Sequence, residues 1–316
     1  MAIEWANIAR FCSFSAVFVV IPSQKESCRM KSIEIKFPRM AFTIAHWILT
    51  LGLSTYFGFL FYTNVGPWYS LIALALIIPT FYFLYLIVLI ILFLHSLILK
   101  HIKVPEEPSR FYAWLLKQND TLLMAVLRVK IIVTGEELLP KNRRFLIVTN
   151  HRSNFDQMVM IKALKETPMV YISKPGNFRI PIAGPFIRAA GFMAINREDP
   201  KEGAKTIMKA VELIKEDKAS IAISPEGTRN KSDDILLPFH PGSFQTAVKS
   251  ECPLVIASLN GTSQVHRRTP WRRSVVTFTI LRTVYPEEYK DMTTRDLANL
   301  SMTLIRDQLN KEGLML

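Results

Sequence analysis

A histidine and an aspartate that could form a catalytic pair stand five residues apart in one short stretch of the chain. The stretch from Phe145 to Gln157 reads FLIVTNHRSNFDQ, an apolar β-branched run followed by a polar turn. On a straight helix His151 and Asp156 would point about 140° apart, since a helix has about 3.6 residues per turn. Across a turn they can meet. Asp156 would then accept a hydrogen bond from one ring nitrogen and leave the other free as a general base.

This arrangement requires the histidine to end a strand and the aspartate to lie in the first turn of a helix. We expect Ser153 or Asn154 to cap that helix, with Gln157 as the capping-box partner of Asn154. A histidine near an aspartate is also common in loops without a catalytic role. However, the sequence contains no nucleophile elbow, zinc-protease motif, Walker loop or dinucleotide fingerprint. A general base in a chain without a nucleophile motif predicts that a hydroxyl group of the substrate itself makes the attack.

Three further blocks follow this stretch in order. They read GFMAINR from Gly191, SPEGTR from Ser224 and PLVIAS from Pro253. Together with NHRSNFD from Asn150, which resembles an HxxxxD motif, they resemble the four blocks of the 1-acylglycerol-3-phosphate acyltransferase family of glycerolipid acyltransferases. The resemblance covers roughly residues 145–259, and the first and third blocks are its most specific parts.

The resemblance implies a reaction and its substrates. His151 would take the proton from a lysophospholipid hydroxyl as that hydroxyl attacks the thioester of acyl-CoA or acyl carrier protein, with Asp156 orienting the imidazole. The acceptor would be 1-acylglycerol 3-phosphate and the product phosphatidate. We expect no bound cofactor and no metal, because the donor is a substrate and the His–Asp pair has no further ligands at useful spacing.

The same resemblance implies where the acceptor binds. Arg197 and Arg229 match block positions associated with its phosphate, which suits a guanidinium because of its bidentate, permanently charged fork. Lys174 follows a predicted strand where related enzymes often carry a basic residue. Gly227 permits unusual backbone angles, and exposed amides beside it could face a phosphate or an oxyanion. The predicted substrate-binding residues are Lys174, Arg197, Glu226, Gly227, Thr228 and Arg229.

Two other functions stay open at this point. The same chemistry could act on a different lysophospholipid or on a lyso-aminolipid. Alternatively, the chain could be a catalytically silent, membrane-anchored lipid-binding protein, although intact His151 and Asp156 argue against that hypothesis.

The elements that must position these residues alternate along residues 101–316. Short runs rich in Val, Ile or Phe predict strands at 130–134, 145–149, 169–173, 192–196, 220–224, 254–259 and 274–284. Helices are predicted at 155–165, 203–215, 243–249 and 294–309, and residues 110–128 predict either an interfacial or a core-facing helix. The pattern indicates an α/β fold, and the resemblance implies a mixed central sheet flanked by helices.

A membrane helical hairpin is predicted at residues 39–100. No Asp, Glu, Lys or Arg occurs between Arg39 and Lys100, and the runs 41–65 and 71–99 each exceed the roughly 20 residues needed to span a bilayer. Pro79 also allows a bent, re-entrant hairpin. Basic residues flank both ends, so the positive-inside rule places the domain of residues 101–316 on the cytoplasmic side of a membrane, the inner membrane if the cell is bacterial. Residues 1–38 predict an interfacial or poorly structured segment.

The amino-acid composition excludes several classes of protein. Half of the 316 residues are hydrophobic and 21% are charged, which excludes a disordered chain. Three separated cysteines exclude a disulfide framework. The net charge of +13 would suit nucleic acid, but the hairpin favours an anionic phospholipid membrane as the partner. The densest basic cluster, HRRTPWRR at 266–273, suits a membrane or acyl-carrier contact or an exposed loop.

Overall fold

The computed structural model describes residues 41–65, 69–101, 107–164, 167–196, 199–268 and 272–313. The predicted segment 1–38, the hairpin turn at 66–68 and Arg197 lie outside these residues. The helices are α1 (Ala41–Val65), α2 (Tyr69–Leu99), α3 (Arg110–Val126), α4 (Phe155–Ala163), α5 (Ala183–Ala189), α6 (Pro200–Lys215), α7 (Gln245–Ser250), α8 (Val265–Arg268), α9 (Pro286–Tyr289) and α10 (Thr294–Glu312). The 3-10 turns are η1 (Glu136–Leu138), η2 (Pro175–Arg179), η3 (Pro241–Phe244) and η4 (Thr262–Gln264). The strands are β1 (Val129–Thr134), β2 (Leu146–Thr149), β3 (Met169–Ser173), β4 (Met193–Ala194), β5 (Ser220–Ile223), β6 (Leu254–Asn260) and β7 (Ser274–Val284).

The strands form one mixed sheet in the order β1-β7-β6-β2-β5-β3-β4. Every described pairing is parallel except β6 with β7, which is antiparallel. Strands β3, β5, β2 and β6 therefore end at one edge of the sheet, and β7 and β1 begin at that same edge. The predicted α/β class with a mixed central sheet is confirmed.

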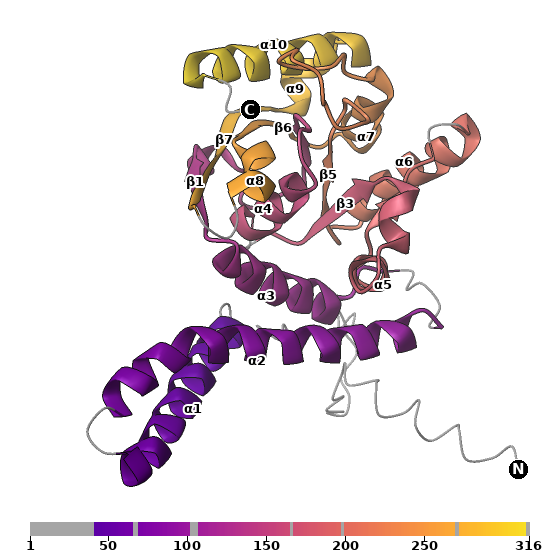
Figure 1. The fold of residues 1–316 in the computed structure, drawn as a ribbon. Helices are drawn as coiled ribbons and strands as arrows, with labels where there is room; N and C mark the ends of the chain where they lie inside the picture. The colour runs from indigo at the N-terminus through magenta and orange to yellow at the C-terminus, as the bar shows by residue number, and fades with distance from the viewer. Residues whose placement is uncertain are drawn as a thin grey trace, which may run out of the picture. The chain divides into compact units, whose positions relative to one another are not determined.

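Helices cover both faces of this sheet (Figure 1). Successive residues of a strand point to opposite faces, and in β2 Leu146 packs in the cluster with α6, α7 and α10 while Ile147 packs in the cluster with α3 and α4. All four residues of β2 and of β5 are buried. These central strands therefore form a rigid base for the loops at their carboxyl ends.

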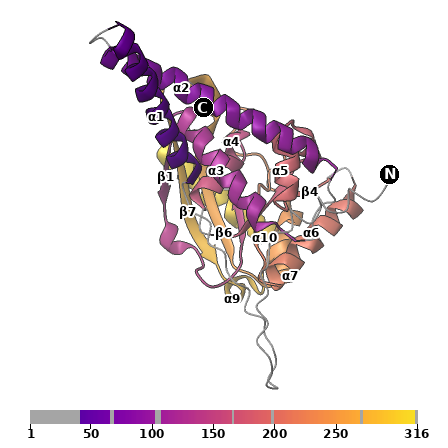
Figure 2. The same cartoon turned by 90° about the horizontal axis from the view of Figure 1, so that it is seen from below.

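Helix α3 lies between the sheet and the two N-terminal helices, which resolves the choice left open by its sequence. Met124 packs on the sheet side. Leu122 packs with Phe81 and Tyr85 of α2, and Leu115 packs with α2 and α5. Figure 2 shows α2 running alongside α3 toward α5. The helix is core-facing on two sides.

Helices α1 and α2 are each long and apolar enough to cross a bilayer. The stretches that meet this criterion are Thr43–Leu60 and Leu74–Leu99. They contact each other through a hydrogen bond from the His46 ring to the Phe81 carbonyl, at 2.9 Å. Large apolar side chains stay exposed along both helices, Ile48 and Ile91 among them. The outer surface of the hairpin is thus suited to a hydrocarbon environment.

Candidate active site

The turn between β2 and α4 carries His151 and is held at its start by Asn150. The Asn150 side chain donates to the Leu259 carbonyl and accepts from the Leu259 N–H, both at 2.8 Å. Because Asn150 is fully buried, this pair of hydrogen bonds ties the end of β2 to the end of β6. The backbone that leaves β2 toward His151 is therefore fixed in position.

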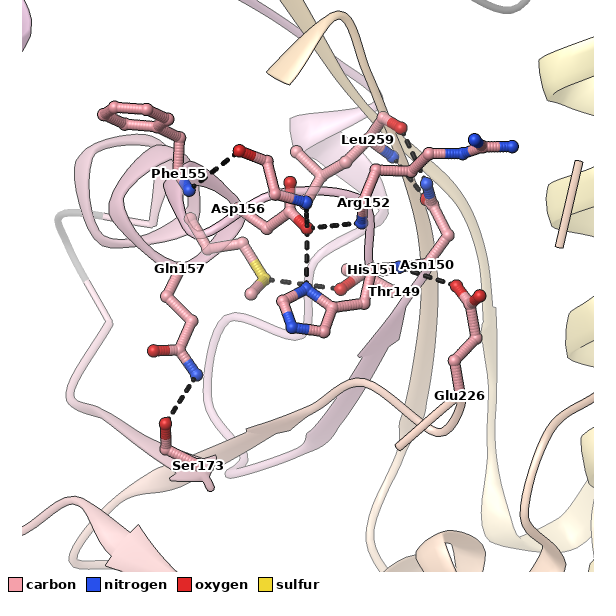
Figure 3. Close-up of polar contacts among 12 residues, drawn as sticks. Thr149, Asn150, His151, Arg152, Phe155, Asp156, Gln157, Ser173, Glu226 and Leu259 are labelled. Carbon is pink, nitrogen blue, oxygen red and sulfur yellow. Dashed lines mark hydrogen bonds and ion pairs between the residues drawn. The ribbon is translucent and has the colours of Figure 1, made fainter. Parts of the chain in front are cut away.

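His151 and Asp156 meet across the turn as expected. The imidazole Nδ1 lies 2.7 Å from Asp156 Oδ2, which also accepts the backbone N–H groups of Arg152 at 2.8 Å and Ser153 at 2.9 Å. An ionised carboxylate only accepts hydrogen bonds, so the proton of the neutral ring sits on Nδ1 and the Nε2 lone pair is free. Figure 3 shows the second ring nitrogen pointing away from the carboxylate. Asp156 is 1% exposed whereas the imidazole is 22% exposed, so only the histidine is accessible to a substrate.

The predicted capping box is wrong. Asn154 already has helical backbone angles and its side chain makes no capping hydrogen bond, whereas a capping box needs an extended N-cap residue. The Ser153 hydroxyl instead accepts from the Phe155 N–H at 3.2 Å. Gln157 donates to the Ser173 hydroxyl at 3.3 Å, and Asn177 donates to the same hydroxyl at 2.7 Å. Gln157 therefore connects α4 to the end of β3.

Glu226, in the loop after β5, binds the backbone of His151 through its carboxylate. Its carboxylate accepts the His151 N–H at 2.6 Å through Oε1 and the Leu237 N–H at 3.0 Å through Oε2. The residue is buried, and burial raises the pKa of its carboxyl to about 7 against the opposing effect of the two N–H donors. We predicted Glu226 as a substrate-binding residue; in the structure both of its oxygens hold backbone groups.

Arg152 and Asn230 connect the histidine turn to the loop of residues 230–237. The Arg152 guanidinium donates to the carbonyls of Ser232, Asp234 and Ile235, and the Asn230 N–H donates to the His151 carbonyl at 2.7 Å. This loop is thereby attached at both ends to the turn that carries His151. Sequence reasoning did not assign roles to these two residues, although both lie in or directly beside the quoted blocks.

The remaining predicted site residues line the same edge of the sheet. Thr228 and Arg229 are exposed in the loop after β5, and Lys174 is exposed directly after β3. Gly227 has φ of +77°, in the left-handed region that favours glycine, as expected. Since β5 lies between β2 and β3, the loops that carry His151, Arg229 and Lys174 are neighbours. Within the described residues, no three His, Cys, Asp or Glu side chains group as a metal site would require.

Comparison with known proteins matches the part of the chain that contains these residues. Residues 130–259 match the family model described as Acyltransferase. The 1-acyl-sn-glycerol-3-phosphate acyltransferase of Borreliella burgdorferi is 33% identical over 135 residues, 43% of this chain and 53% of that protein. The protein of the same description from Saccharomyces cerevisiae is 27% identical over 190 residues, 59% of this chain and 60% of that protein. The chain thus spans less than two thirds of the length of these relatives.

The fold also has a counterpart among solved structures. The crystal structure of the 1-acyl-sn-glycerophosphate acyltransferase of Thermotoga maritima superposes with a TM-score of 0.52 at 20% identity, over 86% of this chain and 97% of that one. This likeness establishes the fold. Across residues 130–259, which include the His151–Asp156 pair and the Glu226 brace, the chain matches the acyltransferase family, and the resemblance drawn from its four sequence blocks is confirmed.

Proposed function

We propose that the chain transfers an acyl group from a thioester to the free hydroxyl of 1-acylglycerol 3-phosphate, giving phosphatidate. The observation that carries this proposal is the His151–Asp156 pair, with Nδ1 held at 2.7 Å and Nε2 free at the accessible edge of the sheet. The descriptions of the similar acyltransferases support the same acceptor.

This geometry supports the following reaction. Nε2 of His151 removes the proton of the acceptor hydroxyl as its oxygen attacks the thioester carbonyl carbon. The C–S bond then breaks, and the imidazolium returns the proton to the leaving sulfur. Asp156 stabilises the imidazolium and keeps the ring oriented throughout. No acyl-enzyme forms, and the donor is acyl-CoA or acyl carrier protein.

The acceptor phosphate would be bound by the basic residues around the histidine. Arg229 stands next to Asn230, whose N–H donates to the His151 carbonyl, and Lys174 follows the strand beyond β5. Arg197, which lies outside the described residues, is predicted for the same task from the resemblance alone. A phosphomonoester held by such charges would place its glycerol hydroxyl toward Nε2.

Attachment to a phospholipid membrane suits this substrate, because the acceptor is itself a membrane lipid. The exposed apolar surfaces of α1 and α2 supply the contact, and the basic flanks of the hairpin favour the cytoplasmic side.

Acyl transfer by the purified protein in detergent tests the proposal. Labelled acyl-CoA and acyl carrier protein would each be offered with lysophosphatidate, lysophosphatidylcholine, lysophosphatidylethanolamine and glycerol 3-phosphate. We expect transfer to lysophosphatidate, reduced at least about a hundredfold in His151→Ala. Transfer only to another acceptor would overturn the substrate, and no transfer with any pair would leave the chain as a lipid-binding protein.

A further inference from the structure

Five exposed arginines gather at the edge of the sheet where β1 and β7 begin. Because β1 and β7 are parallel with Val129 opposite Ser274, the residues that precede them, Arg128 and Arg273, lie side by side. Two more arginines end α8, and another precedes Arg273. We call this group the arginine patch: Arg128, Arg267, Arg268, Arg272 and Arg273.

Backbone hydrogen bonds hold the parts of the arginine patch together. The Arg272 N–H donates to the Arg268 carbonyl at 2.8 Å, which returns the chain from α8 toward β7. The Ser274 N–H donates to the Arg128 carbonyl at 3.3 Å, which links the start of β7 to the end of α3. The backbones of the three segments that carry these arginines therefore meet at this edge of the sheet.

A pocket of about 320 Å³ opens within this surface. Among described residues its lining combines the guanidinium-bearing Arg128 and Arg273 with the apolar Met124, Ala125 and Val129. Among the residues that the structure describes, the lining contains no carboxylate and no aromatic ring. Such a pocket matches a phosphate group joined to hydrocarbon better than it matches a nucleotide, whose base would seek a ring to stack on.

Four of the five arginines carry charges that an external anion would neutralise. In the part of the chain that the structure describes, no ion pair joins Arg267, Arg268, Arg272 or Arg273 to a carboxylate. Adjacent like charges repel each other, and an anion between them would offset that repulsion. Phosphate is the anion that a guanidinium fork binds best, through two parallel hydrogen bonds.

Along α3, the residue that lines the pocket is less than one helical turn from the residue that contacts the hairpin. Leu122 of α3 packs against Phe81 and Tyr85 of α2, while Met124, two residues later, lines the pocket. Packed helices lie about 8–10 Å apart. The end of α3 that lines the pocket is therefore close to the apolar hairpin and to whatever lipid surface the hairpin contacts.

We propose that the arginine patch binds the phosphate of an anionic membrane phospholipid, with the headgroup in the pocket between α3 and β7 and the start of its acyl chains toward α2. The five arginines include none of the residues assigned above to the His151 turn or to the acceptor phosphate. The proposal rests on the proposed membrane attachment and is independent of the acyl-transfer reaction. Bound lipid would fix the orientation of the hairpin and the sheet together relative to the membrane.

Saturable binding of short-chain phosphatidylglycerol to the full chain in neutral detergent tests the proposal. Phosphatidylcholine of the same chain length serves as the zwitterionic comparison. We expect Arg128→Gln/Arg273→Gln to lower the affinity for phosphatidylglycerol at least about tenfold, since each basic residue near an anionic surface contributes severalfold. Arg267→Gln/Arg268→Gln should lower it in the same direction, which keeps the test valid should the first pair of substitutions impair folding.

A matched control is Lys201→Gln/Lys205→Gln, which removes the same charge from the exposed face of α6 and should retain the affinity of the unaltered protein. Equal loss in this control, or no loss in the arginine variants, would overturn the proposal. Inorganic phosphate or coenzyme A binding as tightly as phosphatidylglycerol would also overturn it, in favour of a free anion or the donor. Acyl transfer to micellar lysophosphatidate should stay unchanged in the arginine variants, so failure here is distinguishable from failure of the proposed reaction.

Discussion

The backbone N–H of His151 donates a 2.6 Å hydrogen bond to the carboxylate of Glu226, which lies 75 residues further along the chain. The second oxygen of that carboxylate holds Leu237. The third sequence block therefore supports the first directly. The position of the histidine depends on the loop after β5 as much as on its own turn.

Titration of Glu226 should appear in the pH dependence of stability. Its folded pKa of about 7 lies above the ordinary value of 4.5, so the folded state holds the extra proton and stability falls as pH rises from about 4.5 to about 7. At about 1.4 kcal/mol per pKa unit, this loss is about 3 kcal/mol. Glu226→Gln should lack this loss, as measured by denaturant unfolding at pH 5 and 7.5, with exposed Glu212→Gln as the control. An equal loss of stability between pH 5 and pH 7.5 in Glu226→Gln and in the unaltered protein would contradict this prediction.

Asp156→Asn should lower kcat at least about a hundredfold with little change in KM. The asparagine amide would present N–H to the imidazole, which favours the ring tautomer with its proton on Nε2 and removes the base. Steady-state kinetics with lysophosphatidate would measure the effect. A tenfold rise in KM with unchanged kcat would instead assign Asp156 to substrate binding.

Arg152→Ala should raise the acceptor KM by loosening the loop of residues 230–237. Three backbone carbonyls lose a charged donor, and each such hydrogen bond contributes about 1.5–3 kcal/mol at most. Faster proteolytic cleavage within the loop is the readout that a purely local effect would not produce. Arg152→Lys should be intermediate, because an ammonium lacks the planar fork. Unchanged cleavage in the alanine variant would show that the loop is held without Arg152.

Arg229→Ala should mainly raise the KM for lysophosphatidate, by about tenfold or more, if the guanidinium binds the phosphate equally in the ground and transition states. Kinetics with the exposed neighbour Lys231→Ala as a control would separate a specific contact from general attraction. Loss of kcat alone would assign Arg229 to the transition state.

Asp120→Asn should stabilise the protein at pH 8 by about 1–3 kcal/mol. Asp120 is 3% exposed, neither carboxyl oxygen has a hydrogen-bond partner among the described residues, and burial raises its pKa well above the ordinary value. A raised acid pKa means that stability is lost as pH rises above the unfolded value of about 3.9. The advantage of the variant should therefore shrink toward pH 4, as followed by thermal unfolding. A less stable variant at pH 8 would contradict this.

Local patterns in the sequence were enough to predict most of the elements. The strand predicted at 169–173 coincides with β3, and that at 274–284 with β7, because β-branched runs between turn residues are a local signal. The strand predicted at 192–196 is only two residues long, since its length depends on pairing with β3. The His151–Asp156 contact was predictable because both residues lie in one turn.

Contacts between distant residues could not be predicted in this way. The resemblance assigns Glu226 to substrate binding, and only the folded chain brings its carboxylate to the backbone of His151. The failed capping box has the same origin, since Asp156 already binds the N–H groups of the turn. The two-sided packing of α3 likewise depends on where the hairpin lies.

The position of α3 makes the apolar hairpin a structural part of the catalytic domain. Leu115 and Leu122 are buried by contact with α2, and Phe186 of α5 joins the same contact. Truncation of the chain before α3 would expose these apolar side chains to solvent. The apolar hairpin is therefore also a packing partner of the sheet domain, and its removal would cost that domain part of its buried surface.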